Sequence, residues 1–198
     1  MRKIYSLLLV TIMAVSLSAC GGNSSGGNTL AILDWMKEGT YHFKYQAEME
    51  VEGEIIATKG WMASNGKAIA SQSEYVMDGE TMIMRLLEKD DMLYIINDVA
   101  KTITKFSSDL GDTSQDVRDF SNMEFVKSGT AHLKGKSYAY DEYIEDGSVV
   151  RFYKEGNNLY AIETISPEVT TLMIIDSYSK NAPAGSFDIP TGYSEFSF

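Results

Sequence analysis

The sequence predicts a mainly β domain: a curved, antiparallel, unclosed β-barrel of about 10 to 11 strands, with two or so short helices over its concave face. Three observations indicate this fold. Residues 40–52 alternate strictly between apolar and polar side chains, which is typical of a strand with one wet face. Turn-forming pairs such as Asn65-Gly66 and Asp146-Gly147 then recur at short intervals. Only two short stretches, residues 30–38 and 114–122, carry a helical period.

The chain begins with features of an export signal. Arg2 and Lys3 precede a mostly apolar run over residues 4–15, which is too short to span a bilayer comfortably. Leu17-Ser18-Ala19-Cys20 follows and resembles a bacterial lipobox. The resemblance implies that residues 1–19 are a lipoprotein signal peptide and that Cys20 becomes a lipidated N-terminus, attached to a membrane by its acyl chains. The alternative is an ordinary secretory signal in which the cysteine is incidental.

Cysteine content and charge narrow the functional classes. Cys20 is the single cysteine, so the mature domain has no disulfide, and a lipidated thiol cannot act as a nucleophile or a metal ligand. Removal of the signal leaves about 180 residues, enough for one domain. The signal contains two of the 17 basic residues and none of the 28 acidic ones. The mature charge of about −13 argues against nucleic acid as a partner and against electrostatic adhesion to anionic lipid.

The segment after the cysteine predicts a tethered domain. Residues 20–28 comprise the lipidated cysteine and a polar stretch rich in glycine, serine and asparagine, which forms a flexible tether. We assign residues 29–198 to the folded domain. Its first element is a helix over residues 30–38, with Leu30, Leu33 and Met36 on one face, and Gly39 ends it. So short a helix requires another element to pack against.

The first half of the domain reads as a meander of strands joined by tight turns. Asn65-Gly66 is the pair preferred in a type I′ hairpin, in which both central residues have positive φ. Asp78-Gly79 and Lys89-Asp90-Asp91 provide further turns. The expected strands are residues 40–52, 54–64, 67–77, 80–88, 92–97 and 101–106.

A second series of strands follows the helix predicted over residues 114–122. The breaks between its strands contain glycine, aspartate, asparagine or proline. Near the end, Pro190 and Gly192 within residues 187–193 oppose a sheet ladder there. The expected strands are residues 124–133, 136–145, 148–154, 158–165 and 170–179.

Several strands are apolar on both faces, notably around residues 82–87, 93–96 and 172–175. A long twisted sheet curls, and helices that cover one face would explain this pattern, so we expect a half-barrel. A two-sheet sandwich would give the same alternation and is the alternative fold.

The lipobox, the tether, the order of elements and the closing Phe187-Asp188-Ile189-Pro190-Thr191-Gly192-Tyr193 together resemble lipoprotein carriers and lipid-binding lipoproteins of the LolA/LppX type. The resemblance implies an unclosed eleven-stranded half-barrel whose concave face, lidded by helices, holds acyl chains or another apolar ligand. Carriers that shuttle across a periplasm are usually soluble, whereas this chain keeps an anchor. This departure from the family favours a membrane-bound receiver, binder or sensor over a long-range carrier.

Large, adaptable apolar side chains are candidates to line such a ligand space, because thioethers and broad rings fit irregular guests. Arg85 stands between apolar neighbours and is a candidate to bind an anionic headgroup, with a salt bridge to an acidic residue as its alternative. The same apolar residues could equally fill a plain core. The apolar candidates are Trp61, Met62, Met77, Met82, Met84, Met92 and Tyr94.

No pattern in the sequence supports catalysis or a metal site. His42 and His132 stand among polar neighbours without metal-binding spacing, so we interpret them as solvated residues on strand faces. Glu48, Glu50 and Glu52 lie on the wet face of one strand. We predict a protein that is not an enzyme and needs no cofactor.

The sequence thus favours a lipoprotein outside the cytoplasm, anchored to a bacterial cell membrane, that binds a lipid or acyl chain without covalent chemistry. The alternative is an envelope protein-interaction or sensing module, in which the same side chains form a filled core and a sheet edge or acidic face meets a partner.

Overall fold

The computed structural model describes residues 39–51, 53–77, 79–107 and 123–197. The expected signal peptide, Cys20, the expected tether and the two helices expected over residues 30–38 and 114–122 lie outside these ranges. The described ranges contain strands and turns but no helix, and therefore no helix long and apolar enough to cross a membrane.

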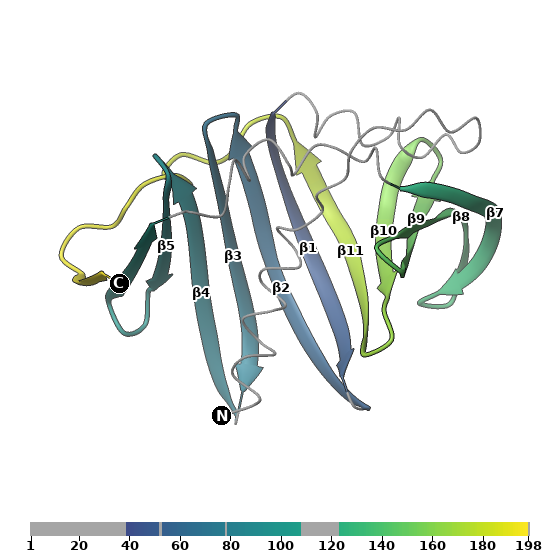
Figure 1. Cartoon of the computed structure of the whole chain (residues 1–198), viewed down its shortest axis with the longest axis horizontal. Coiled ribbons are helices and arrows are strands. Elements are labelled where there is room, and N and C mark those ends of the chain that lie inside the picture. Colours follow the sequence, from purple (N-terminus) through teal and green to yellow (C-terminus); the bar gives the residue numbers. More distant parts are fainter. Residues whose placement is uncertain (1–38, 52, 78, 108–122, 198) are drawn as a thin grey trace.

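All the described strands belong to one 12-stranded sheet, in the order β12-β6-β5-β4-β3-β2-β1-β11-β10-β9-β8-β7 (Figure 1). Neighbouring strands are antiparallel except β12, which runs parallel to β6. The strands are β1 (Thr40–Val51), β2 (Glu54–Asn65), β3 (Ala68–Met77), β4 (Glu80–Lys89), β5 (Met92–Asn97), β6 (Thr102–Ser107), β7 (Glu124–Leu133), β8 (Lys136–Glu145), β9 (Ser148–Glu155), β10 (Asn158–Ile165), β11 (Val169–Ser179) and β12 (Ser194–Ser197).

The pairing of β1 with β11 joins two meanders into one open sheet. Figure 1 shows that the sheet twists strongly, with β7 and β8 turned away from the direction of β1. Lys134, in the turn between β7 and β8, forms an ion pair with Glu48 on β1, with 2.7 Å between Nζ and Oε1. Since β9, β10 and β11 separate β8 from β1, this contact requires a curved sheet. The expected unclosed half-barrel is confirmed, and the two-sheet sandwich is wrong.

The alternation in β1 divides the sheet into two faces. We call the side of Tyr41, Phe43 and Tyr45 the core face, and the side of Lys44 and Glu50 the charged face. Antiparallel pairing places directly opposite residues on the same face, so the register carries this division across the sheet. Along β1, the core-face side chains are buried, whereas Lys44, Gln46, Glu48 and Glu50 are exposed.

The largest hydrophobic cluster lies on the core face and runs from β3 across β1 to β8. It includes the fully buried rings of Tyr41, Phe43, Tyr143 and Phe152. Two smaller clusters lie on the charged face, one around Leu87, Ile96 and Ile103 and the other around Tyr138, Tyr153 and Ala161. Both faces are therefore apolar in parts, as the sequence pattern predicts.

The segment between β11 and β12 packs on the charged face. Phe187, Ile189 and Tyr193 cover the cluster that contains Leu87. The hydroxyl of Tyr193 donates a hydrogen bond to Oδ1 of Asp98 (2.8 Å) and accepts one from Nζ of Lys101 (3.0 Å). The closing phrase of the sequence therefore fastens the end of the chain across β4, β5 and β6.

The observed strands match the predicted eleven within a residue or two at their ends, but β12 is an additional strand. No ladder forms within residues 187–193, as expected. The chain rejoins the sheet directly afterwards, when the backbone N–H of Ser194 donates to the carbonyl oxygen of Lys101 (2.9 Å).

One predicted turn type is wrong. Asp146 and Gly147 both have positive φ (47° and 79°), as a type I′ turn requires, whereas at the β2–β3 turn Gly66 has positive φ and Asn65 does not. The Asn65 side chain explains the difference, because its Oδ1 accepts hydrogen bonds from the backbone N–H groups of Lys67 (2.9 Å) and Ala68 (2.8 Å). Such a side-chain turn replaces the backbone geometry of type I′.

Candidate functional site

The structure distributes the candidate ligand-lining residues over both faces of the sheet. Met62, on β2, belongs to the core face. Met82 and Met84, on β4, share that face according to the register. Met77 is the last residue of β3. The remaining candidates, which lie on the charged face, are Trp61, Arg85, Met92 and Tyr94.

Three of the four charged-face candidates, Trp61, Arg85 and Tyr94, lie close to the segment between β11 and β12. Trp61 and Tyr94 pack against the cluster that this segment covers. One terminal nitrogen of Arg85 donates to the backbone carbonyl oxygen of Asp188 (3.3 Å). Its described polar contact is thus with a backbone carbonyl rather than with the carboxylate that we considered from the sequence.

The core face of β4 and β5 carries large apolar side chains that remain half-buried. These residues belong to none of the three hydrophobic clusters of the described residues. We call this surface the apolar wall: Met82, Met84, Leu86, Leu93 and Ile95. Half-exposed apolar side chains that share one face form a surface suited to an apolar partner.

Small residues separate the apolar wall from the aromatic side chains of β1. Gly60 on β2 lies opposite Ser73 on β3, whose hydroxyl is hydrogen-bonded to the hydroxyl of Tyr45 (2.9 Å). A Cβ atom at Gly60 would lie 2.0 Å from the carbonyl oxygen of Gln72 and 3.0 Å from the Tyr45 hydroxyl. Close approach of backbone and ring therefore requires glycine at this position.

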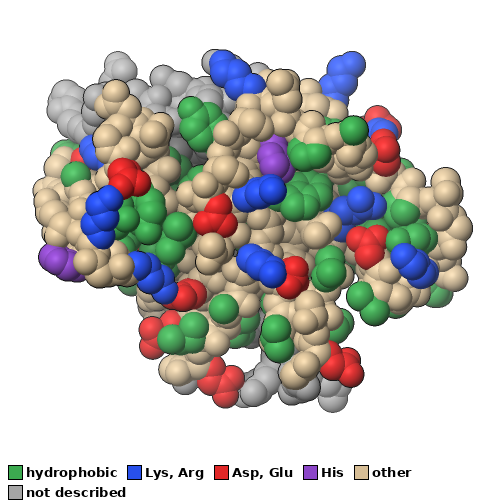
Figure 2. Space-filling model, turned by 180° about the vertical axis from the view of Figure 1, so that it is seen from behind, with side chains coloured by type: hydrophobic (Ala, Val, Ile, Leu, Met, Phe, Trp, Pro, Cys, Tyr) green, Lys and Arg blue, Asp and Glu red, His purple; other side chains and the backbone are tan. Residues whose placement is uncertain are grey.

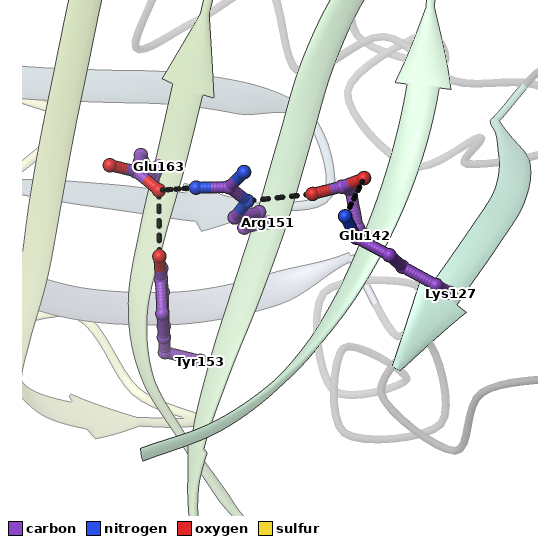
Figure 3. A network of polar contacts seen from close by, with 5 residues as sticks. All are labelled: Lys127, Glu142, Arg151, Tyr153 and Glu163. Atoms are coloured by element: carbon purple, nitrogen blue, oxygen red, sulfur yellow. Dashed lines mark hydrogen bonds and ion pairs between the residues drawn. The ribbon is translucent and has the colours of Figure 1, made fainter. Parts of the chain in front are cut away.

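A row of charged residues crosses β7 to β10 on the charged face (Figure 3). Arg151 lies at its centre, donating from Nε to Glu142 (2.8 Å) and from a terminal nitrogen to Glu163 (3.1 Å). The hydroxyl of Tyr153 donates to the same oxygen of Glu163 (2.6 Å), and Nζ of Lys127 lies 3.3 Å from Oε1 of Glu142. Each charge therefore has an opposite charge beside it.

The pKa values in this row favour the charged forms of the ion pairs. Desolvation acts to raise the pKa of Glu142, but the hydrogen bonds from Arg151 and Lys127 outweigh it, so this pKa lies below its ordinary value. Desolvation, together with the hydrogen bond to Glu163, raises the pKa of Tyr153 to about 12. Groups so firmly charged or protonated are poor proton-transfer catalysts near neutral pH, and the row stabilises the sheet instead.

The two histidines differ in environment. His132 is exposed, as expected. His42 is only 8% exposed, so our interpretation of it as solvated is wrong. The ring of Trp61 on the neighbouring strand lies 6.1 Å from its own, and desolvation, followed by the charge of Lys44, lowers the pKa of His42. Among the described residues, no group of three or more His, Cys, Asp or Glu side chains is placed to hold a metal ion.

No protein-family model matches the sequence, and no curated protein matches it. Solved structures do match. An uncharacterized conserved protein from Thermus thermophilus superposes with a TM-score of 0.51 at 9% identity, covering 87% of this chain and 100% of that one. The likeness is one of fold.

Two further solved structures come from mycobacteria. The Mycobacterium tuberculosis lipoprotein LppX gives a TM-score of 0.49 at 13% identity, covering 79% of this chain and 97% of its own. LprF from Mycobacterium bovis gives a TM-score of 0.47 at 10% identity, covering 87% of this chain and 100% of its own.

The sequence pattern did not predict the row of charged residues around Arg151. Its members Glu142, Arg151 and Glu163 each stand beside an aromatic or aliphatic residue of the core face, namely Tyr143, Phe152 and Ile162. That pattern gives their common face, but their pairing depends on the register of β8, β9 and β10. The register is a property of three strands together, which no single stretch of sequence reveals.

Figure 2 shows one face of the molecule, over which basic and acidic side chains are interspersed. A surface of mixed sign produces no extended field to attract a highly charged polymer. The ion pairs of the charged face, such as those of Lys134 with Glu48 and of Arg151 with Glu142, instead join parts of the sheet to one another.

Proposed function

We propose that this protein is a lipid-anchored protein outside the cytoplasm that holds an apolar ligand, such as an acyl chain, against the core face of its half-barrel. The observation that carries the proposal is the apolar wall, where half-buried methionine, leucine and isoleucine side chains share one face outside the packed clusters. Met82 and Met84 are the ligand-lining residues in this proposal.

Binding by partition needs no reactive group. Each methylene that leaves water contributes about 0.8 kcal/mol, so a long acyl chain gains several kcal/mol on a surface of this kind. Unbranched methionine side chains adjust to guests of different shape. The described ion pairs hold the sheet together. In this proposal the apolar wall binds the ligand.

The anchor is tested at Cys20. Replacement by Ser removes the thiol that lipid attachment requires, so the Cys20→Ser chain should fail to incorporate radiolabelled palmitate and should leave the membrane fraction. The unchanged chain, labelled in parallel, should incorporate it. Equal labelling of the two chains would contradict the lipoprotein assignment.

Ligand binding is tested by native mass spectrometry of the Cys20→Ser chain, purified from bacteria without detergent. We expect a bound species of lipid mass, which extraction and fragmentation then identify. A chain that carries no such species and also fails to take up a fluorescent acyl probe would overturn the proposal. It would favour an interaction module that uses the edge strand β7 or an acidic surface.

A further inference from the structure

Ser71, on β3, has a buried hydroxyl without a hydrogen-bond partner. The residue is 2% exposed, and its Oγ atom has no hydrogen-bond partner among the described residues. The hydroxyls of its neighbours differ: Ser73 bonds to Tyr45, and Ser64 donates to the carbonyl oxygen of Gly39 (2.8 Å). A buried polar group left unpaired is costly, so such a group calls for an explanation.

The register places Ser71 beside the apolar wall. On one side it lies opposite Met62 of β2, and on the other it lies opposite Leu86 of β4, all on the core face. Directly opposite side chains in an antiparallel sheet have Cβ atoms about 5 Å apart. A molecule lying against Leu86 would therefore lie next to the Ser71 side chain, whose Oγ atom is covered in the unliganded structure and becomes accessible only when neighbouring side chains move.

The charge of the surroundings limits what that molecule can present. Within the described strands β2 to β5, no lysine or arginine occupies the core face. An anionic phosphate or carboxylate would lose its hydration here without a cation to balance it. A neutral carbonyl oxygen accepts a hydrogen bond without that penalty, and a saturated hydrocarbon accepts none.

We propose that the Ser71 hydroxyl donates a hydrogen bond to the carbonyl oxygen of an ester-linked acyl chain. The ligand class is then a neutral acyl ester, in preference to a free fatty acid or a hydrocarbon. This inference rests on the proposed function, because it assigns the polar contact of a ligand that the apolar wall holds.

The test compares two lipids that differ only in the carbonyl group: 1-palmitoylglycerol, an ester, and 1-O-hexadecylglycerol, the corresponding ether. Each displaces the fluorescent probe N-phenyl-1-naphthylamine, which has no carbonyl group, from the full chain carrying Cys20→Ser. We expect the ester to bind about 5- to 10-fold more tightly than the ether, which corresponds to one buried hydrogen bond. Ser71→Ala should remove this preference by weakening the ester alone.

Ser73→Ala is the matched control. The hydroxyl of Ser73 is already hydrogen-bonded to that of Tyr45, so its removal should leave the preference for the ester intact. Ser71→Ala should not lower the melting temperature of the unliganded chain, since the lost hydroxyl has no partner there. Equal affinity of the unsubstituted Ser71 chain for ester and ether, or a preference that survives Ser71→Ala, would overturn the inference and leave the proposed function standing. Failure of the probe and both lipids to bind would overturn both.

Discussion

Tyr143, on β8, is fully buried, and its hydroxyl has no hydrogen-bond partner among the described residues. Desolvation, and then the charge of Asp141, raises its pKa from 10 to about 12. In the unfolded chain the phenol ionises near pH 10, so between pH 10 and 12 the unfolded state binds fewer protons than the folded state. The free energy of unfolding therefore falls as pH rises through this window.

Tyr143→Phe should remove both the unpaired hydroxyl and its contribution to the pH dependence of stability. At pH 7 the free energy of unfolding should be unchanged or higher, because an unpaired buried hydroxyl costs about 1–3 kcal/mol. Between pH 10 and 12 the stability of the variant should fall less steeply. Urea denaturation at pH 7, 10 and 11 measures the stability and its pH dependence. Tyr153→Phe is the control, because it loses a hydrogen bond to Glu163 and should lower the free energy of unfolding at pH 7. A Tyr143→Phe chain less stable at pH 7 would contradict the assignment of an unpaired hydroxyl.

Residue-scale predictions from the sequence succeed where the cause is local. Asp146-Gly147 adopts the expected turn because two residues set its geometry. Asn65 departs from it because its side chain binds the backbone beyond the turn. His42 is buried beside Trp61 on the adjacent strand, a neighbour that the alternation within β1 cannot reveal.

At the scale of the element, the pairing of β2 with β3 depends on Gly60. An added Cβ would lie 2.0 Å from the carbonyl oxygen of Gln72. This oxygen belongs to the backbone of the paired strand, so it cannot move aside as a side chain can. Gly60→Ala should lower the free energy of unfolding by about 2–3 kcal/mol, measured by urea denaturation. Gly129→Ala, where the nearest atoms belong to the Tyr140 ring at 2.7 Å, should cost less because a side chain can move. Equal losses would refute this account.

The two faces of β4 allow a second test at this scale. Met84→Asp places a charge on the apolar wall, where it should abolish binding of N-phenyl-1-naphthylamine while the half-buried site lets the chain still fold. Ile83→Asp puts the same charge on the opposite face of the same strand and should leave binding intact. Circular dichroism checks folding. Unfolding by Met84→Asp, with Ile83→Asp folded, would show that the wall is a filled core.

Strands are the scale at which the sequence is most informative. Alternation and turn pairs placed eleven strands within one or two residues, since both signals are local. The sequence grouped Trp61 and Tyr94 with Met82 and Met84 as candidates to line one ligand space. In the structure the two pairs lie on opposite faces of the sheet. Strands apolar on both faces give no internal sign of which side faces which partner.

At the scale of the whole molecule, the C-terminal segment should stabilise β4, β5 and β6. Phe187 is half-buried against the Leu87 cluster, so Phe187→Ala should lower the free energy of unfolding by about 2 kcal/mol. Phe196 on β12 is 50% exposed, and Phe196→Ala should change it by less than about 0.5 kcal/mol. Thermal or urea denaturation compares the two. A similar effect of both substitutions would show that the segment contributes little.

The overall order of strands could be predicted only in part. The lipobox-like stretch, the meanders and the closing phrase together indicate a half-barrel. The parallel pairing of β12 with β6 has no local signature, because it depends on how residues 180–193 cross the sheet. The Ser71 hydroxyl likewise looks ordinary in sequence and stands out only once burial and register are known.

The junction of β12 with β6 has a consequence for biogenesis. Lys105 and Glu195 are paired although 90 positions separate them, and Gln46 reaches Asp176 across 130. The edges of β1 and β6 pair with β11 and β12, which are synthesised late in the chain. Pairing between segments so far apart in sequence is slow. The sheet therefore cannot be complete until β11 and β12, residues 169–179 and 194–197, have been synthesised.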